Sequence, residues 1–306
     1  MNPSSPVRIG TRGSPLALAQ TEIVRRLLAA AHGELALEVV AIRTSGEQIL
    51  DRPLADAGGK GLFTKEIDEA LLSGRIELAV HSAKDVPTFL APGIRLAAFP
   101  PREDAREALL SAKADSLERL AAGAVVGTSS VRRQALVKRL RPDLAVKLMR
   151  GNVGTRLQKV KAGEFDAAVL ALAGLRRLGL EGEARALLDP ATFPPSVGQG
   201  AIAVAIREGD ERMETFVAAI DHAPTSIALA AERAFLTALG GSCRAPIAGH
   251  ARIKGERLDL HGLVIAPDGT GAVETKREGP LSEAVALGHD AGMELRARAP
   301  AGVLEA

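Results

Sequence analysis

The sequence contains one cysteine, no tryptophan, no tyrosine and only seven phenylalanines among its 306 residues. A single cysteine excludes an internal disulfide, which agrees with a reducing compartment, so we expect a cytoplasmic protein. The scarcity of aromatic side chains removes the stacking platforms on which single-stranded nucleic acids bind. The formal net charge of +2 is also small for a nucleic-acid-binding chain. These absences disfavour a nucleic-acid partner.

Several other signals are missing. No run of about 18 or more apolar residues occurs, so we expect no membrane-spanning helix. The N-terminal segment MNPSSPVRIGTRGSP has no basic region followed by an apolar one, so we predict no secretory signal. The six histidines lack metal-ligand spacing, so we expect no metal site. A Walker loop, a G-x-G-x-x-G fingerprint and a G-x-S-x-G elbow are absent too.

Strand-like and helix-like segments alternate through the first two thirds of the chain, which predicts an α/β architecture. Ser14 and Pro15 are typical of an N-cap followed by proline at the first helical position. The apolar run LALEVVAI predicts a strand buried on both faces. VRIGTRGSP and AVVGTSSV both join a strand to a helix through Gly-Thr and a nearby serine, which indicates two related lobes.

We therefore predict three domains. Lobe 1 comprises residues 1–101 with 200–218, where the apolar strand AIAVAI returns to the first sheet, and lobe 2 comprises residues 102–199. The remainder, 222–306, predicts a small α+β domain with an antiparallel sheet. Its signals are a helix ended by glycines, a hairpin with a Pro-Asp-Gly turn and a final helix.

Cationic and hydroxyl side chains gather at the predicted strand-to-helix loops, which edge the ligand crevice in open α/β sheets. Any one of them, taken alone, is best explained as a solvated surface residue. The whole set at loop positions instead favours a site for a small ligand that carries many negative charges. The set comprises Arg12, Ser14, Lys60, Lys84, Thr128, Ser129, Ser130, Arg132, Arg133, Arg150, Arg156 and Arg177.

Two residues have no single explanation from the residues alone. Asp85 either has a structural role, in which it neutralises Lys84 or caps the turn before Pro87, or binds N–H donors, stabilises a cation and shuttles a proton. Cys243, in LGGSCRAPI, is a buried structural cysteine, a redox sensor, a nucleophile or an attachment point. For Cys243 the residues alone favour the buried structural cysteine.

Taken together, the loops resemble one family closely, porphobilinogen deaminase, also called hydroxymethylbilane synthase. The resemblance runs in family order from about residue 8 to residue 250, and HSAKDVPT and GTSSVRRQ are specific by themselves. The matching segments are RIGTRGSPLALAQ, GGKGLFTKE, AVHSAKDVPT, GTSSVRRQAL, RGNVGTRLQK, LAGLRRLG, VGQGAIAV and GSCRAPI.

The resemblance implies a transferase that joins four porphobilinogen molecules head to tail into hydroxymethylbilane with release of ammonia. It also implies two lobes similar to periplasmic solute-binding proteins, with a cleft between them, and a third domain whose cysteine carries a covalent dipyrromethane cofactor. By this resemblance Asp85 is the catalytic residue, and it stabilises the cationic azafulvene formed when ammonia leaves. We expect a monomer whose partner is the small molecule porphobilinogen.

The resemblance also assigns binding roles to individual residues. The cofactor-binding set is Cys243 (covalent), Lys84, Asp85, Thr128, Ser129, Ser130, Arg132 and Arg133. The substrate-binding set is Arg12, Ser14, Gln20, Lys60, Phe63, Arg150, Arg156 and Arg177.

The sequence departs from the family pattern at two positions. Asp56 stands where some members have lysine, and Ser242 replaces the second glycine before the cysteine. The glycine-containing segment from Ile49 to Gly61 is our candidate for a mobile lid. A non-catalytic solute-binding protein is the main alternative, but it predicts an export signal and leaves Asp85 and Cys243 unexplained. A regulatory nucleic-acid binder is a weaker alternative.

Overall fold

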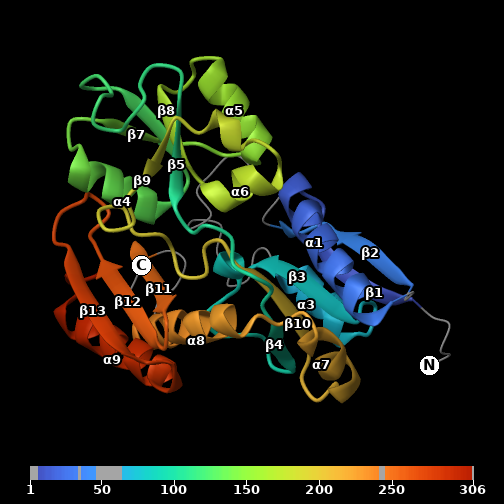
Figure 1. Ribbon diagram of the computed structural model, residues 1–306. Coiled ribbons are helices and arrows are strands. Elements are labelled where there is room, and N and C mark those ends of the chain that lie inside the picture. The colour runs from blue at the N-terminus through green and yellow to red at the C-terminus, as the bar shows by residue number, and fades with distance from the viewer. Residues whose placement is uncertain (1–5, 34–35, 46–63, 241–244, 305–306) are drawn as a thin grey trace. The chain divides into compact units, whose positions relative to one another are not determined.

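The computed structural model describes residues 6–33, 36–45, 64–240 and 245–304 (Figure 1). The chain divides into two compact units. Unit 1 comprises Met1–Glu103 and Ala201–Ser226, and unit 2 comprises Asp104–Gly200 and Ile227–Ala306. Across the described ranges, no helix is both long and apolar enough to cross a membrane.

Unit 1 is built on a five-stranded mixed sheet. In order across the sheet its strands are β2 (Leu37–Ile42), β1 (Val7–Arg12), β3 (Leu78–Ser82), β10 (Ile202–Arg207) and β4 (Ile94–Ala98). β1 runs parallel to β2 and β3, whereas β10 runs antiparallel to β3 and β4. The predicted return of the AIAVAI strand to the first sheet is confirmed. The prediction that LALEVVAI is buried on both faces is wrong, because β2 is an edge strand and Val39 is exposed.

Helices cover both faces of this sheet because its strands alternate their apolar side chains. The helices are α1 (Pro15–His32), α3 (Lys65–Leu72) and α7 (Glu211–Ala218). Val80 packs in one buried cluster with Leu28 of α1 and Val217 of α7. Ala79, the preceding residue, packs on the other face with Ile67 of α3. This alternation is the two-residue period of a strand between two apolar layers.

The start of α1 is set locally, as predicted. The Ser14 hydroxyl accepts a hydrogen bond from the Ala17 backbone N–H at 3.3 Å, and Pro15 occupies the first helical turn. The short loop between β1 and α1 therefore holds Arg12 and Ser14 at the carboxyl end of β1.

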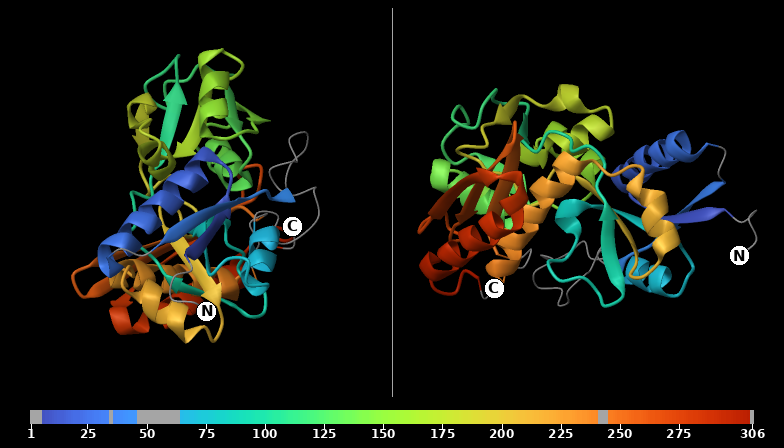
Figure 2. Two further views of the ribbon diagram at one scale, coloured as in Figure 1. Left: turned by 90° about the vertical axis from the view of Figure 1, so that its right-hand side faces the viewer. Right: turned by 60° about the horizontal axis from the view of Figure 1, so that its bottom comes forward.

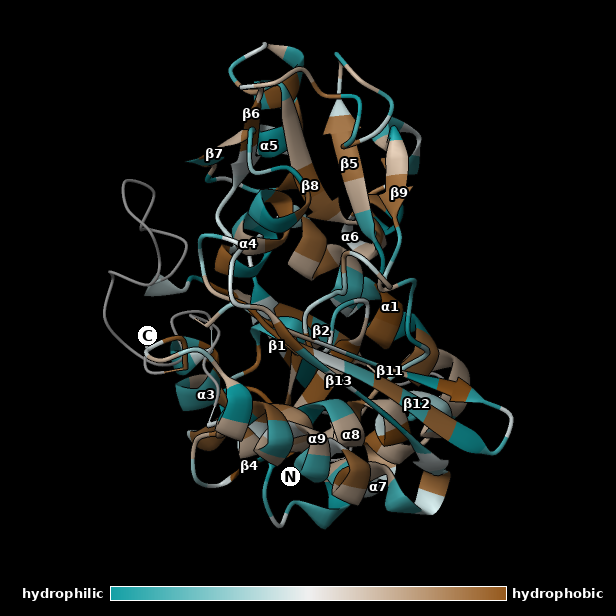
Figure 3. Cartoon of the chain, turned by 90° about the vertical axis from the view of Figure 1, so that its left-hand side faces the viewer, coloured by the Kyte–Doolittle hydropathy of each residue, from teal (hydrophilic) through white to brown (hydrophobic). Residues whose placement is uncertain are grey.

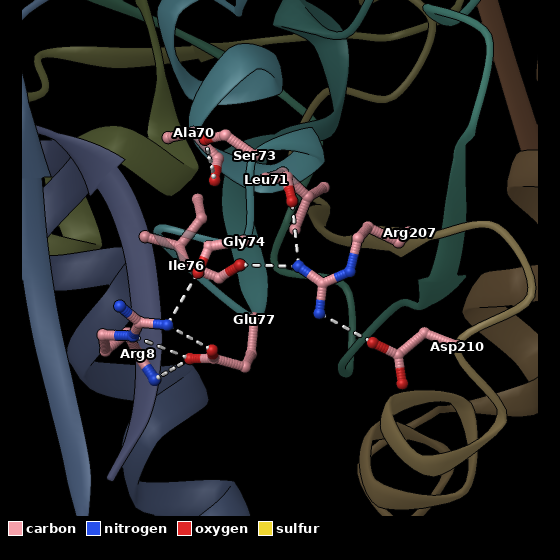
Figure 4. A network of polar contacts seen from close by, with 9 residues as sticks. All are labelled: Arg8, Ala70, Leu71, Ser73, Gly74, Ile76, Glu77, Arg207 and Asp210. Carbon is pink, nitrogen blue, oxygen red and sulfur yellow. Dashed lines mark hydrogen bonds and ion pairs between the residues drawn. The ribbon is translucent and has the colours of Figure 1, made fainter. Parts of the chain in front are cut away.

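A polar network joins the strands of this sheet at the ends that lie away from Arg12 (Figure 4). Glu77, just before β3, accepts hydrogen bonds from the backbone N–H of Arg8 at 2.8 Å and from its Nη2 at 2.6 Å. Arg207, at the end of β10, donates from Nη1 to the carbonyls of Leu71 and Ile76 and pairs with Asp210 through Nη2. These bonds join Arg8 of β1 to the segment just before β3, and join the end of β10 to that segment and to the end of α3, at the strand ends away from Arg12.

Unit 2 contains a second five-stranded sheet with the same arrangement. In order across the sheet its strands are β7 (Ala145–Leu148), β6 (Val125–Thr128), β8 (Ala167–Ala171), β5 (Glu107–Ser111) and β9 (Ala186–Leu188). Its helices are α4 (Val131–Leu140), α5 (Val153–Lys161) and α6 (Leu172–Arg177). Each sheet begins with three parallel strands, in the order β2-β1-β3 in unit 1 and β7-β6-β8 in unit 2. An antiparallel strand follows, β10 or β5, and the last strand is β4 or β9. The predicted pair of related lobes is confirmed.

The glycine of each Gly-Thr pair has the same packing role in the two lobes. A Cβ atom on Gly10 would lie 2.2 Å from Ile76 Cδ1, and one on Gly127 would lie 2.2 Å from Met149 Cε. Each glycine therefore leaves room for a large apolar side chain beside its own strand, β1 for Gly10 and β6 for Gly127. The shared Gly-Thr motif therefore has a packing role in each lobe, in addition to its position just before a strand-to-helix loop.

The C-terminal part of unit 2 is an antiparallel three-stranded sheet with two helices, and the prediction of an antiparallel sheet with two helices is confirmed. The elements are α8 (Ala223–Ala238), β11 (Ile247–Lys254), β12 (Arg257–Val264), β13 (Val273–Pro280) and α9 (Ala284–Arg298). Figure 2 shows α9 lying along the sheet. The hairpin of β12 and β13 is the predicted one, whereas β11 was not predicted.

Glycines let these layers approach closely. The Phe235 ring of α8 lies over the cross-strand pair Gly249 and Gly262, where a Cβ on Gly262 would come within 2.7 Å of the ring. Gly288 brings α9 to the backbone of α8, because a Cβ there would lie 2.1 Å from the Ala231 carbonyl oxygen.

The core of the second lobe also receives residues from the C-terminal sheet. Leu263 and Ala248 pack in one buried cluster with Leu109 and Val169. The strands β5 and β8 that carry the latter two residues are hydrophobic along most of their length (Figure 3). The α/β fold class with a small antiparallel C-terminal sheet is confirmed. The division into domains 1–101 with 200–218, 102–199 and 222–306 stays a prediction.

Candidate active site

A pocket of about 50 Å³ lies in unit 1 at the carboxyl ends of β1 and β3. That volume admits a few water molecules or one small polar group of a ligand. The lining residues are Arg12, Ser14, Leu16, Ala17, Gln20, Thr64, Val80, His81, Ser82 and Asp85. The pocket therefore collects four of the residues predicted from sequence, Arg12, Ser14, Gln20 and Asp85.

Asp85 and Arg12 form the charged pair of this pocket. Asp85 ends a one-turn 3₁₀ helix, Ala83–Asp85, that directly follows β3. Its Oδ2 lies 3.8 Å from Arg12 Nη1, and the two side chains are 37% and 22% exposed. At that separation the ion pair is longer than a hydrogen bond, so the carboxylate keeps acceptor positions for N–H donors of a ligand. Lys84 is half-buried in the same turn.

The polar floor of the pocket is held by neighbouring side chains. Gln20 is buried in α1, and its Nε2 lies 2.9 Å from Ser82 Oγ. His81 is 7% exposed, and burial together with the nearby Arg12 guanidinium lowers the pKa of His81 to about 4. The imidazole is therefore neutral at neutral pH. The sequence reasoning missed Ser82 and His81, although both precede Lys84 in the segment HSAKDVPT.

Unit 2 presents hydroxyl groups and an arginine at the carboxyl ends of its parallel strands. Thr128 ends β6, and Ser130 caps α4 by accepting a hydrogen bond from the Arg133 N–H. Arg156 Nη2 donates to Ser129 Oγ at 3.1 Å, and Arg156 Nε donates to the Gly151 carbonyl at 2.8 Å. Arg156 is thereby fixed beside the β6 loop.

Two further predicted arginines lie in unit 2. Arg150 is half-buried at the loop after β7, and burial lowers its pKa from the usual value. Arg177 ends α6 and donates from Nη2 to the Gly200 carbonyl at 2.6 Å.

Arg132 and Arg133, which the resemblance assigns to the cofactor, lie in the first turn of α4 with both side chains buried. Their side chains are only 5% and 7% exposed, and both bind the carboxylate of Glu107, which is fully buried. Sequence reasoning missed Glu107, and its only signal was a single acidic residue at the start of the apolar strand EALLS.

Three predicted site residues, Lys60, Phe63 and Cys243, lie outside the described residues, as do Asp56, Ser242 and the predicted lid from Ile49 to Gly61. In the part of the chain that the structure describes, no group of three or more His, Cys, Asp or Glu side chains is arranged to hold a metal ion.

Comparison with known families shows which family the chain belongs to. A family model described as "Porphobilinogen deaminase, dipyromethane cofactor binding domain" matches residues 7–215. A second, described as "Porphobilinogen deaminase, C-terminal domain", matches residues 226–297. The chain belongs to the porphobilinogen deaminase family. The resemblance found in the sequence motifs is thereby confirmed, and both halves of the chain share it.

Individual relatives agree with this family. The porphobilinogen deaminase of Nitrobacter winogradskyi is 59% identical over 294 residues, which cover 95% of this chain and 93% of the relative. That of Nitrobacter hamburgensis is 59% identical over 293 residues, with the same coverage. Among solved structures, a periplasmic substrate-binding protein of an ABC transporter from Coxiella burnetii is 16% identical. Its TM-score is 0.45, over 70% of this chain and 91% of that one.

Proposed function

We propose that this chain joins four porphobilinogen molecules head to tail into hydroxymethylbilane and releases ammonia at each step. The observation that carries the proposal is the match of the porphobilinogen deaminase family to nearly the whole chain, together with the Arg12–Asp85 pocket. Family membership also removes the reason to prefer the solute-binding alternative. That the enzyme is a monomer acting in the cytoplasm remains part of the proposal.

The residues of the chain fit a dipyrromethane cofactor. This group carries acetate and propionate arms, which need cationic and hydroxyl donors, and pyrrole N–H groups, which need an acceptor. Within unit 2, Arg156, Ser129 and Thr128 would supply donors, and within unit 1, Asp85 would supply an acceptor. When bound, the group supplies a pyrrole carbon to which substrate is joined. We propose that Cys243 holds it through a thioether.

The remaining members of the predicted sets keep their proposed roles. Lys84, Ser130, Arg132 and Arg133 would hold carboxylates of the cofactor. Arg12, Ser14, Gln20, Lys60, Phe63, Arg150 and Arg177 would contact the substrate.

Asp85 is the residue that we propose to act on the substrate. Loss of ammonia from the aminomethyl group leaves a cationic azafulvene, which an ionised carboxylate stabilises by charge and by accepting the pyrrole N–H. Asp85 would give one proton to the leaving amine and, as the carboxylate so formed, would later accept the proton that the ring carbon loses, so the two transfers balance at one group. Arg12 would hold a substrate carboxylate close by, and the neutral His81 adds no further positive charge to the pocket.

The intact mass of the purified protein tests the covalent cofactor. We expect wild-type protein to be heavier than its sequence by two linked pyrrole units, and Cys243→Ser to have the bare-chain mass. Ser242→Ala is the matched control, because it changes the neighbouring residue and keeps the thiol, and it should retain the extra mass. Active wild-type protein with a bare-chain mass would overturn the proposal.

A further inference from the structure

The strand that enters the sheet of unit 2 begins with a charged residue in a buried position. Glu107 is the first residue of β5, which runs antiparallel to β8. Glu107 therefore pairs with Ala171, the last residue of β8, and lies at the carboxyl end of that strand. This is the same edge of the sheet as Thr128, at the end of β6.

Glu107 binds two guanidinium groups at once. Its Oε1 accepts hydrogen bonds from Arg132 Nη2 and from Arg133 Nε, the latter at 3.0 Å. Its Oε2 accepts from Arg133 Nη2 at 2.9 Å. Arg132 Nη1 also donates to the Pro194 carbonyl at 2.7 Å. Each guanidinium is thus held in a fixed orientation, and the Nη1 edge of Arg133 points away from the carboxylate that holds its other edge.

The charges of Arg132, Arg133 and Glu107 do not balance one another. Two guanidiniums and one carboxylate sum to one positive charge, and the three side chains are 5%, 7% and 0% exposed. Burial lowers the pKa of Arg132, because a buried site solvates a cation poorly. Both arginines also lie in the first turn of α4, where the helix dipole disfavours positive charge.

Stability alone does not account for such a cluster. A buried ion pair seldom adds more stability than apolar side chains of the same volume, and an uncompensated buried cation is costly. An excess of one positive charge beside the loop of Thr128, Ser129 and Ser130 instead matches one carboxylate of a ligand. Because Glu107 fixes the two guanidiniums, its position determines where the ligand carboxylate binds.

We propose that Glu107 is a positioning residue for cofactor capture, which orients Arg132 and Arg133 toward one carboxylate arm of the dipyrromethane. The inference rests on the proposed function, because it takes the cofactor as the ligand of these arginines. In this role Glu107 acts through the two arginines and not on the cofactor or the substrate directly.

Three variants test this role. Glu107→Gln removes the negative charge at constant size, and Glu107→Asp keeps the charge but withdraws it by one methylene. Glu77→Gln is the matched control, because Glu77 is also a buried carboxylate bound to an arginine, Arg8, at the far edge of the sheet in unit 1. The measurements on each purified protein are cofactor occupancy from intact mass and the midpoint of thermal unfolding.

We expect occupancy to fall at least threefold in Glu107→Gln and less in Glu107→Asp, while Glu77→Gln keeps wild-type occupancy although its unfolding midpoint also falls. Wild-type occupancy in Glu107→Gln would overturn the proposal and leave Glu107 a structural residue. If Glu107→Gln does not fold, Glu107→Asp decides, and full occupancy in that variant overturns it. Wild-type protein without the extra mass would instead refute the proposed function, and this inference with it.

Discussion

Replacing Asp85 by asparagine is the most direct test of the site. The change keeps the size of the side chain and removes its charge. A cation about 4 Å from the carboxylate, similar to the 3.8 Å of Arg12 Nη1, gains about 4 kcal/mol at an effective dielectric constant of about 20 but only about 1 kcal/mol in water. Because the Asp85 side chain is 37% exposed, solvent screening places the loss between these values. The charge alone then accounts for roughly a 5- to 1,000-fold fall in kcat, and lost proton transfer lowers it further.

The assay is the single-turnover rate of ammonia release from porphobilinogen, measured on protein whose intact mass shows bound cofactor. Normalising the rate to occupancy separates slow chemistry from poor cofactor capture. Asp115→Asn is the control, because Asp115 is a largely exposed carboxylate paired with Arg119 in unit 2, and its rate should equal that of wild type. A rate for Asp85→Asn within about threefold of wild type would remove Asp85 from the mechanism.

Two further predictions concern stability. The pKa of His81 is lowered to about 4, so below pH 6.5 the unfolded chain binds a proton that the folded chain does not. Stability should therefore fall by up to about 3 kcal/mol as the pH drops from 6.5 to 4. In His81→Asn, urea unfolding should show a smaller fall over that range, and an unchanged fall would contradict the assignment. Gly288→Ala should cost about 1–3 kcal/mol in thermal unfolding, because its Cβ would lie 2.1 Å from the Ala231 carbonyl oxygen. Gly182→Ala, with open space around it, should cost much less, and equal losses would refute the packing argument.

Features encoded by neighbouring residues were predictable from the sequence. The Ser14 cap, the Pro-Asp-Gly hairpin and the paired Gly-Thr loops each depend on a few adjacent positions, and each occurs as expected. The exposure of β2 was not predictable, because an apolar run does not reveal whether its strand lies at the centre or the edge of a sheet. That property depends on strand order, which residues far along the chain determine.

The identity of several site residues was predictable from the sequence, but their burial and their partners were not. The motifs indicated Arg12, Ser14, Gln20 and Asp85, which line one pocket. They gave no sign that Arg132 and Arg133 are buried, because their partner Glu107 lies 25 residues before Arg132 in the sequence. The depressed pKa of His81 likewise arises from burial and from Arg12, which only the folded sheet brings near. The roles of Lys60, Phe63 and Cys243 stay predictions.

The position of β10 has a consequence for how the chain folds during synthesis. Val204 pairs with Val80 and Ala98, so the strand between β3 and β4 is made more than 100 residues after both of its neighbours. The first sheet is therefore incomplete when its N-terminal strands leave the ribosome. The strands of the second sheet, β5 to β9, instead follow one another along the chain. Closing so long a loop is slow, and it leaves the edges of β3 and β4 without their partner meanwhile. Substitutions in β10 are therefore expected to lower the yield of folded enzyme more than their distance from the pocket implies.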